Sequence, residues 1–353
     1  MKEKFLQKYL KVINNKNYLL ILYKSTALSD DQINSLNDLY VSGFGDKASN
    51  NPYMKSFTIG NGLTAWKWKN QESPEKEKNI CGIILYQEKI IGFISYLAFK
   101  AKIMNQTTII YQENDCTIAE GHRGINLYKF ARETLINYIT SRQTAAIWYG
   151  FPNKINPVSH KKICKRWNIP VNLDVPFLQN NCLNQEYITN IFPIKQIPDE
   201  IDLICSSMIS ENSFQIIHDK KFYQWRYLDI PFNKHCYHIL AHSNESNEID
   251  GILVLKIYKE NEQLKGHILD ICTNNQQSFK KLVLGAEKFL IDNSINNCSL
   301  FLFPGTPNYD FLQQRYSSTI EGFVYTSGPL VLNLNFAEIY HNPFIQAGDN
   351  DVF

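Results

Sequence analysis

Runs of apolar residues in the N-terminal part of the chain predict a meander of β-strands. Residues 18–26 (YLLILYKST) form one such run, and residues 81–87 and 90–100 form two more. Only two residues separate the latter pair, a spacing typical of a β-hairpin. The run at 107–119 follows them and predicts a third strand in the same sheet.

Apolar residues at helical spacing lie between and after these strands. Residues 32–44 and 125–142 each place apolar side chains on one face, which predicts two amphipathic helices. Residues 66–69 (WKWK) alternate instead, as an exposed strand would. Residues 145–151 predict another strand, and residues 156–167 another helix.

The order of elements repeats in the C-terminal part. Residues 168–198 are rich in Pro and Asn and predict a connection between domains. Three predicted strands, a helix and a strand then follow, at residues 236–242, 251–258, 266–273, 276–292 and 298–304. This echo indicates a structural duplication. We therefore expect an α/β (α+β) protein with domains at 1–185 and 186–353.

Composition narrows the functional classes. A chain of 353 residues with 44% hydrophobic content has enough material for two cores. The net charge of +2 argues against a protein that coats nucleic acid. The eight cysteines form no CxxC pair, and no apolar run is long enough to span a membrane. We expect a cytoplasmic protein with free thiols and no membrane insertion.

The junction between the third strand and its helix carries the clearest chemical pattern. Gly121 and Gly124 permit a tight turn, and the first amides of the following helix lack intrahelical partners. The helix N-terminus favours an anion, and His122 and Arg123 add donors beside it. No P-loop or dinucleotide fingerprint is present. The turn predicts a site for phosphates, although a plain structural turn has the same local sequence features.

The stretch GHRGINLYKF after an antiparallel meander resembles the R-G-x-G-x-G/A signature of the GNAT acyltransferase superfamily. Arg123 and Gly124 match that signature, whereas Asn126 and Tyr128 stand where small residues are usual. The resemblance implies tandem GNAT-like domains, each a mixed, mostly antiparallel twisted sheet flanked by helices, and acyl-coenzyme A as co-substrate. The implied coenzyme contacts within this stretch are Thr117, Ile118, Ala119, His122, Arg123, Gly124, Ile125, Asn126, Leu127 and Tyr128.

The downstream stretch WYGFPNKINPVSHKKICKRW is similar to a segment of GNAT subgroups linked to surface-polysaccharide synthesis. In that resemblance Asn153 contacts the pantetheine. His160, or Ser159 with a shift of one residue, takes the place of the acid that protonates the leaving thiolate. The later segment WRYLDIPF and the tail GDNDVF resemble two-domain bacterial enzymes that acylate dTDP-3-amino-3,6-dideoxyhexoses. The resemblance implies an acetyl or 3-hydroxybutanoyl donor and a product for O-antigen or capsule synthesis.

Acyl transfer to an amine also needs a polarised carbonyl and a proton acceptor. Backbone amides at 117–119 are candidates for polarising the carbonyl. Glu113 and Asp115 are candidate bases, and strand alternation predicts that they share one face. Asp115 is preferred because it lies closer to the turn, and Tyr149 is a further candidate.

The second half lacks the Arg-Gly turn, so we expect one coenzyme site per chain and an acceptor pocket shaped by the second half. Trp225, Arg226, Tyr227 and Asp270 are the candidate acceptor residues. An Arg beside aromatic rings suits a nucleotide diphosphate, and it equally suits a structural role in the core. The spacing of the His and Cys residues predicts no metal site.

Two other functions fit the same architecture. A Fem-like aminoacyl transferase for peptidoglycan precursors also has paired GNAT domains and takes its donor from aminoacyl-tRNA. A non-catalytic acyl-coenzyme A binding module would bind the coenzyme without turnover. The Arg123 turn argues against the Fem-like alternative.

Overall fold

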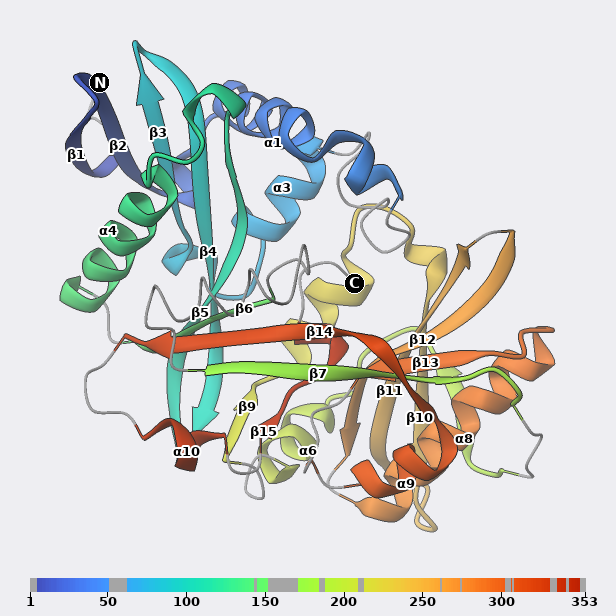
Figure 1. The fold of residues 1–353 in the computed structure, drawn as a ribbon. Helices are drawn as coiled ribbons and strands as arrows, with labels where there is room; N and C mark the ends of the chain where they lie inside the picture. The colour runs from blue at the N-terminus through green and yellow to red at the C-terminus, as the bar shows by residue number, and fades with distance from the viewer. Residues whose placement is uncertain are drawn as a thin grey trace.

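A computed structural model describes the fold of most of the chain (Figure 1). The residues that it describes are 5–50, 62–142, 145–151, 171–183, 188–208, 213–260, 262–273, 275–301, 306, 308–330, 335–340 and 343–349. The strands of this part of the chain form one mixed, mostly antiparallel sheet. Their order is β1-β2-β3-β4-β5-β6-β14-β7-β13-β12-β11-β10-β8.

The N-terminal sheet half begins with a meander of hairpins. Its strands are β1 (Phe5–Ile13), β2 (Lys16–Lys24), β3 (Ile80–Tyr86), β4 (Lys89–Ile103), β5 (Gln106–Ile118) and β6 (Ala145–Gly150). Both residues of the two-residue turns at 14–15, 87–88 and 104–105 have positive φ. Such turns match the twist of a hairpin, so the predicted meander is confirmed, with β1 as an additional edge strand.

Helices cover both faces of this sheet half. Helix α4 (Leu127–Arg142) packs on one face through Leu127, Ala131 and Leu135. Helices α1 (Asp30–Asn50) and α3 (Gly62–Gln71) lie on the other face (Figure 1). The predicted strand at 66–69 is wrong, because these residues lie within α3. Trp66, Trp68 and Lys69 are all buried there. The alternation of Trp and Lys in the sequence therefore comes from a helix that is buried on two sides.

The C-terminal sheet half repeats this order. Strands β10 (Tyr237–Ser243), β11 (Ile249–Glu260) and β12 (Gln263–Thr273) form a meander, and helix α8 (Gln276–Asp292) follows. Strand β13 (Cys298–Phe301) then pairs with β12 in parallel, as β6 pairs with β5. The predicted duplication is therefore present as a repeat of strand, helix and strand order.

The two sheet halves exchange strands. Strand β7 (Val171–Asn180) pairs with β13, and strand β14 (Ser317–Pro329) pairs with β6. Strands β7 and β14 also pair with each other and join the halves (Figure 1). The prediction that 168–198 is only a connection is wrong, because β7 and β8 (Ile191–Ile194) lie within it. The predicted domain boundary at residue 185 stays a prediction. Strand β7, before this boundary, pairs with β13 of the C-terminal sheet half, and strand β14, after it, pairs with β6 of the N-terminal sheet half.

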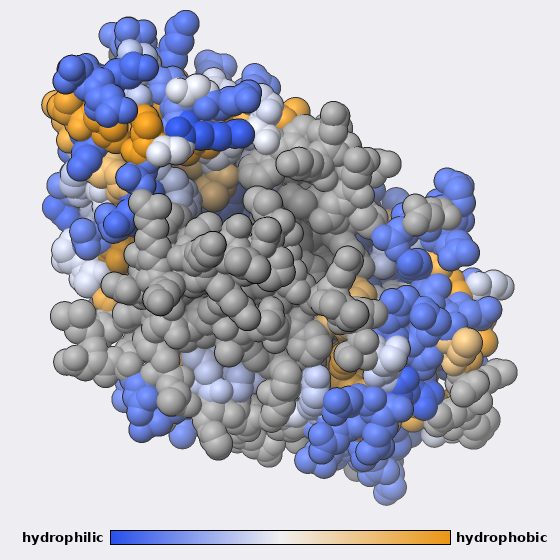
Figure 2. Space-filling model, viewed as in Figure 1, coloured by the Kyte–Doolittle hydropathy of each residue, from blue (hydrophilic) through white to orange (hydrophobic). Residues whose placement is uncertain are grey.

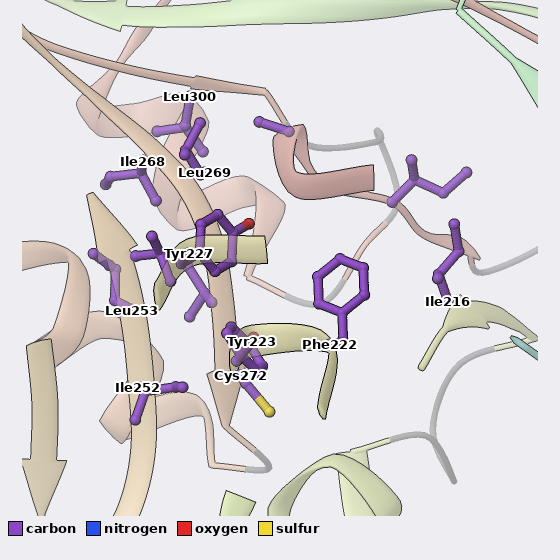
Figure 3. Packing of buried hydrophobic residues seen from close by; sticks show 14 of the residues in the cluster. Ile216, Phe222, Tyr223, Tyr227, Ile252, Leu253, Ile268, Leu269, Cys272 and Leu300 are labelled. Carbon is purple, nitrogen blue, oxygen red and sulfur yellow. The ribbon is translucent and has the colours of Figure 1, made fainter. Parts of the chain in front are cut away.

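Short elements complete the described chain around the junction of the halves. The helices are α6 (Ile201–Met208), α7 (Lys220–Tyr223), α9 (Tyr309–Arg315) and α10 (Phe336–Ile339), with the π-helical turn η5 (Gln224–Leu228), and the strands are β9 (Phe214–Ile216) and β15 (Pro343–Phe344). Phe222, Tyr223 and Tyr227 from α7 and η5 pack into the apolar core of the C-terminal sheet half (Figure 3). This segment therefore links the core to the junction.

The surface adds little to the assignment of a site. The described surface in Figure 2 is largely hydrophilic, with apolar patches over the β1–β2 hairpin, where Leu10 and Val12 are exposed. No helix among the described residues is long and apolar enough to cross a membrane. The cysteines that the structure describes are free thiols.

Candidate active site

The C-terminal end of β5 extends beyond its neighbour β6. The register between these two parallel strands ends at Gln112 and Tyr149, within the described residues. On its other side β5 stays paired with β4 as far as Ile118. The end of β5 therefore has one edge that faces away from β4 and is not covered by β6. An extended ligand could add its own hydrogen bonds along such an edge.

One of the backbone amides at 117–119 faces the open edge. The amide of Ala119 donates to the carbonyl of Ile91 at 2.8 Å. Hydrogen bonding alternates along an antiparallel pair, so the Thr117 amide also faces β4 and the Ile118 amide faces the open edge. Of the candidate amides at 117–119, the Ile118 amide is therefore the one that faces away from β4.

A β-bulge at Asp115 separates the two predicted bases. Ile94 is paired with Cys116 and Ser95 with Asn114, so Asp115 is the extra residue of β5. The prediction that Glu113 and Asp115 share one face is wrong. Glu113 contacts helix α4, whereas Asp115 contacts helix α3 on the other face. The bulge inserts one residue and therefore breaks the two-residue alternation of the strand.

Both oxygens of Glu113 are engaged by protein donors. Tyr128 donates its hydroxyl to Oε1, Tyr96 donates to Oε2 at 2.8 Å, and Arg132 Nε lies 2.7 Å from Oε2. Arg132 also stacks on Trp148, with its guanidinium carbon 4.0 Å from the ring centroid. This arrangement fixes α4 against β5 and leaves Glu113 poorly placed to accept a proton from a substrate. It also turns the bulky Tyr128 side chain towards the strand.

Asp115 belongs to a smaller polar cluster with α3. Lys69 Nζ lies 2.5 Å from Asp115 Oδ2 and 3.2 Å from Asn114 Oδ1. The side chains of Lys69 and Asp115 are mostly buried, so solvent screens this ion pair only weakly. The sequence analysis missed Lys69. No local sequence pattern signals it, because its contact with Asp115 depends on how α3 packs against β5.

The turn after β5 is open at its glycines. A short 3₁₀ turn (Glu120–His122) leads to Gly124 at φ +77° and Asn126 at φ +61° before α4 begins. No atom lies within 4 Å of where a Cβ would stand at Gly121 or Gly124. A ligand can therefore approach the backbone closely here. The first amides of α4 need an acceptor from outside the helix.

The two basic side chains of the turn have different roles. His122 packs against Tyr18 and Tyr86, and its Nδ1 lies 3.2 Å from the Tyr18 hydroxyl. Arg123 is exposed, and its Nε donates to the carbonyl of Ile118 at 2.8 Å. Arg123 is therefore the exposed cation beside the turn, whereas His122 packs against the aromatic rings of β2 and β3.

Several of the remaining predicted coenzyme residues have side chains that pack into or against the protein. Leu127 is buried in the core under α4, and Ile125 packs against the same core. The Thr117 side chain is buried beside α1, because a Cβ at Gly43 would lie 2.6 Å from its Oγ1. Asn153 and His160 lie outside the described residues, so their predicted roles stay predictions.

A small pocket at the junction of the two sheet halves collects several other predicted residues. Tyr149, Trp225 and Arg226 line it together with Lys69 and Gln112. The Tyr149 hydroxyl donates to the carbonyl of Asp349 at 3.4 Å, and Tyr149 is fully buried. Three residues predicted separately, as a base and as acceptor contacts, therefore lie at one place.

Two tryptophans, one from each sheet half, contact each other at this junction. The rings of Trp68 and Trp225 stack with centroids 5.1 Å apart. Each indole nitrogen donates to the other residue's carbonyl at 3.0 Å. Arg226 lies over both rings, with centroid distances of 5.7 and 6.0 Å. Trp225 is thus a structural contact between the sheet halves as well as a wall of the pocket.

Asp270 lies in a buried network below the pocket. Its carboxylate accepts from Tyr223 and Tyr227 at 2.9 and 3.0 Å, and it lies 2.7 Å from His218 Nδ1. His218 Nε2 lies 2.8 Å from Asp349 on its other side. Burial disfavours the imidazolium, but the two carboxylates outweigh burial and raise the His218 pKa to about 10. Tyr227 and Asp270 therefore bind the tail segment at 346–349 and the core.

The equivalent turn of the C-terminal sheet half is closed. Asn275 caps α8, and its side chain accepts from the amides of Gln277 and Ser278 at 2.7 and 3.3 Å. Asp250 accepts from the Ser278 hydroxyl at 2.7 Å and binds His242 at 2.5 Å. The protein itself satisfies the start of this helix. This difference supports one coenzyme site per chain, in the N-terminal sheet half.

Comparison with known proteins identifies the fold. The sequence matches no protein-family model, and it matches no curated protein sequence significantly. A conserved Enterococcus faecalis protein described as a probable N-acyltransferase matches with a TM-score of 0.62 at 10% identity, over 92% of this chain and 73% of that chain. Saccharomyces cerevisiae N-myristoyltransferase with bound myristoyl-coenzyme A matches with a TM-score of 0.60 at 9% identity, over 92% and 85%.

A GCN5-related N-acetyltransferase from Anabaena variabilis matches with a TM-score of 0.60 at 11% identity, over 90% of this chain and 74% of that chain. At these identities the likeness concerns the fold and not the activity. The predicted fold class is confirmed: the chain has the tandem α/β fold found in GNAT-type N-acyltransferases.

Proposed function

We propose that this protein is an acyl-coenzyme A-dependent N-acyltransferase whose acceptor is the amine of a nucleotide-linked amino sugar. The sequence resemblance favours a sugar of the dTDP-3-amino-3,6-dideoxyhexose type, an acetyl or 3-hydroxybutanoyl donor, and a role in O-antigen or capsule synthesis. The observation that carries the proposal is the open junction of β5 and α4. It offers a strand edge that β6 does not cover beyond Gln112, and a glycine turn beside Arg123.

The junction has separate places for the two ends of a coenzyme thioester. The pyrophosphate would lie at Gly121–Gly124, where backbone amides, the α4 dipole and Arg123 provide positive charge. The pantetheine arm would follow the free edge of β5. The thioester carbonyl would then reach the Ile118 amide, which can stabilise the oxyanion of the tetrahedral intermediate.

The reaction proceeds by direct attack. The amine nitrogen bonds to the thioester carbon, the carbon–sulfur bond breaks, and the thiolate leaves. The amine loses a proton during this step. Asp115 is better placed than Glu113 to accept it, because Lys69 binds one Asp115 oxygen whereas protein donors engage both oxygens of Glu113.

Thiol release tests this proposal directly. The protein is incubated with acetyl-, propionyl- or 3-hydroxybutanoyl-coenzyme A and with a panel of nucleotide-linked amino sugars. We expect thiol release that requires both substrates, and mass spectrometry should identify the N-acylated sugar. Coenzyme A binding without release for any pair would instead indicate a binding module. Transfer from aminoacyl-tRNA would indicate a Fem-like enzyme.

A further inference from the structure

Lys256 is a buried cation that has no counter-ion among the described residues. It lies on β11, and only 3% of its surface is exposed. Its Nζ has no hydrogen-bond partner within the described part of the chain, and the neighbouring Tyr237 ring lies 5.3 Å away. Removing an ammonium group from water without pairing it costs several kcal/mol. Such a cost is expected where a ligand provides the missing anion.

Strand pairing fixes the direction of the Lys256 side chain. Lys256 is paired with Tyr237 on β10 and with His267 on β12. Gly266, next to His267, faces α8, because a Cβ there would lie 2.4 Å from Leu290. Lys256 and its cross-strand neighbours therefore point to the face opposite α8.

The same face carries the acceptor candidate Arg226. Tyr227, next in sequence, places its ring centroid 5.9 Å from that of Tyr237, so η5 packs beside Lys256. Burial, and next the positive charge of Arg226, lower the Lys256 pKa to about 8. Arg226 also lines the pocket at the junction of the sheet halves. Arg226 therefore lies at the pocket and close enough to Lys256 for its charge to act on the ammonium group.

The other titratable groups beside Lys256 do not neutralise it. Burial raises the pKa of Cys236 and of Tyr237, which keeps both of them protonated and uncharged. His267 lies 2.7 Å from the Ser299 hydroxyl, and burial together with the Lys256 charge lowers its pKa to about 3. The immediate surroundings therefore provide positive charge and neutral donors, which is the composition of an anion site.

We propose that Lys256 and Arg226 form an anion-binding subsite that holds a phosphate or carboxylate group of the acceptor. This inference rests on the proposed function and assigns the residues that hold the anionic part of its acceptor. The subsite lies on the C-terminal sheet half, apart from the turn at Arg123. The donor and the acceptor would therefore be bound through their phosphates or carboxylates by different halves of the sheet.

Anion titration by calorimetry tests the subsite. Inorganic pyrophosphate and succinate serve as probes, and saturating coenzyme A occupies the Arg123 turn. We expect saturable binding of one or both anions and at least a tenfold weaker affinity in Lys256→Met. Lys259→Met is the matched control, because Lys259 lies on the same strand but is exposed and paired with Glu262. It should retain the wild-type affinity.

Stability provides a second readout that a purely structural lysine would not give. Replacing an unpaired buried ammonium by an apolar side chain should raise the unfolding temperature without anion. Added pyrophosphate should stabilise the wild type more than Lys256→Met. Arg226→Met provides an independent variant and should also weaken anion binding. Equal anion affinity in wild type and Lys256→Met, or no saturable binding to the wild type, would overturn the subsite.

The pH dependence has a defined sign. The ammonium form of Lys256 binds the anion, so affinity should fall as pH rises through about 8 in the wild type. The residual binding of Lys256→Met should lack this step. Coenzyme A affinity is measured in the same samples. Failure to bind coenzyme A would argue against the proposed function, whereas failure of the anion step alone would argue against the subsite.

Discussion

The junction of β5 with α4 and the junction of β12 with α8 have the same order of elements, but the residues at the start of the two helices differ. At α8, Asn275 caps the first amides, and Asp250 binds Ser278 and His242 beside the cap. At α4, the turn has Gly124 at φ +77° and an exposed Arg123. The duplicated fold thus provides two helix N-termini, and side chains decide which one is left for an external anion.

The two helices are anchored by similar networks of buried charge. Glu113 on β5 binds Arg132 and Tyr128 of α4. Glu287 on α8 lies 2.7 Å from Arg315 and accepts from Tyr316 at 2.7 Å. The comparison indicates that both carboxylates hold a helix in place. Chemistry at the first junction must then come from other groups.

The largest expected effect is a loss of stability when either of the two carboxylates, Glu113 or Glu287, is neutralised. Glu113→Gln and Glu287→Gln should each lower the free energy of unfolding by about 3 kcal/mol, because each takes the carboxylate from an arginine that is buried (Arg132) or mostly buried (Arg315). Chemical denaturation measures the change. Coenzyme A affinity of folded Glu113→Gln should stay near wild type. A loss of turnover in Glu113→Gln without a loss of stability would instead assign Glu113 to catalysis.

Charge reversal tests the difference between the two helix starts. Arg123→Glu should weaken coenzyme A binding by about 10- to 100-fold, because it replaces a charge-assisted bond to phosphate by repulsion. Lys280→Glu makes the same charge change in the first turns of α8 and should leave coenzyme A affinity unchanged. Calorimetric titration compares the two variants. Equal affinities in both would mean that the phosphates are not bound at Arg123.

A smaller change tests the backbone of the open turn. Gly124→Ala should cost about 1–2 kcal/mol of stability, because a Cβ disfavours the left-handed conformation. It should also weaken coenzyme A binding. Gly121→Ala is the control for backbone strain, since Gly124 has a positive φ and Gly121 does not. Thermal unfolding without coenzyme A compares the strain in the two variants, and equal stability of both would contradict a special role of the Gly124 conformation.

The smallest expected effect concerns the closed turn. Asn275→Ala should lower stability by about 1 kcal/mol through loss of the α8 cap. Asn275→Asp keeps an acceptor for the same amides and should stay close to wild type. Neither change should alter coenzyme A affinity. Coenzyme A binding that depends on Asn275 would show that the second junction also takes part.

Some features of the site were predictable because they depend on local sequence. The glycines and Arg123 lie within a few residues of each other, so the strand, turn and helix could be placed together. The Glu113 and Asp115 faces could not be predicted, because the bulge depends on pairing with β4. Lys69 was missed because burial on two sides gives α3 the alternating pattern of a strand.

Sequence alone determined the repeated order of strands and helices, the α/β class and the single Arg-Gly turn. These follow from hydrophobic period and turn chemistry, which act over a few residues. Only the tertiary structure decided the exchange of β7 and β14, the Trp68–Trp225 contact and the burial of Lys256 without a counter-ion among the described residues. Each of these depends on which distant segments become neighbours, and a local pattern does not encode that choice.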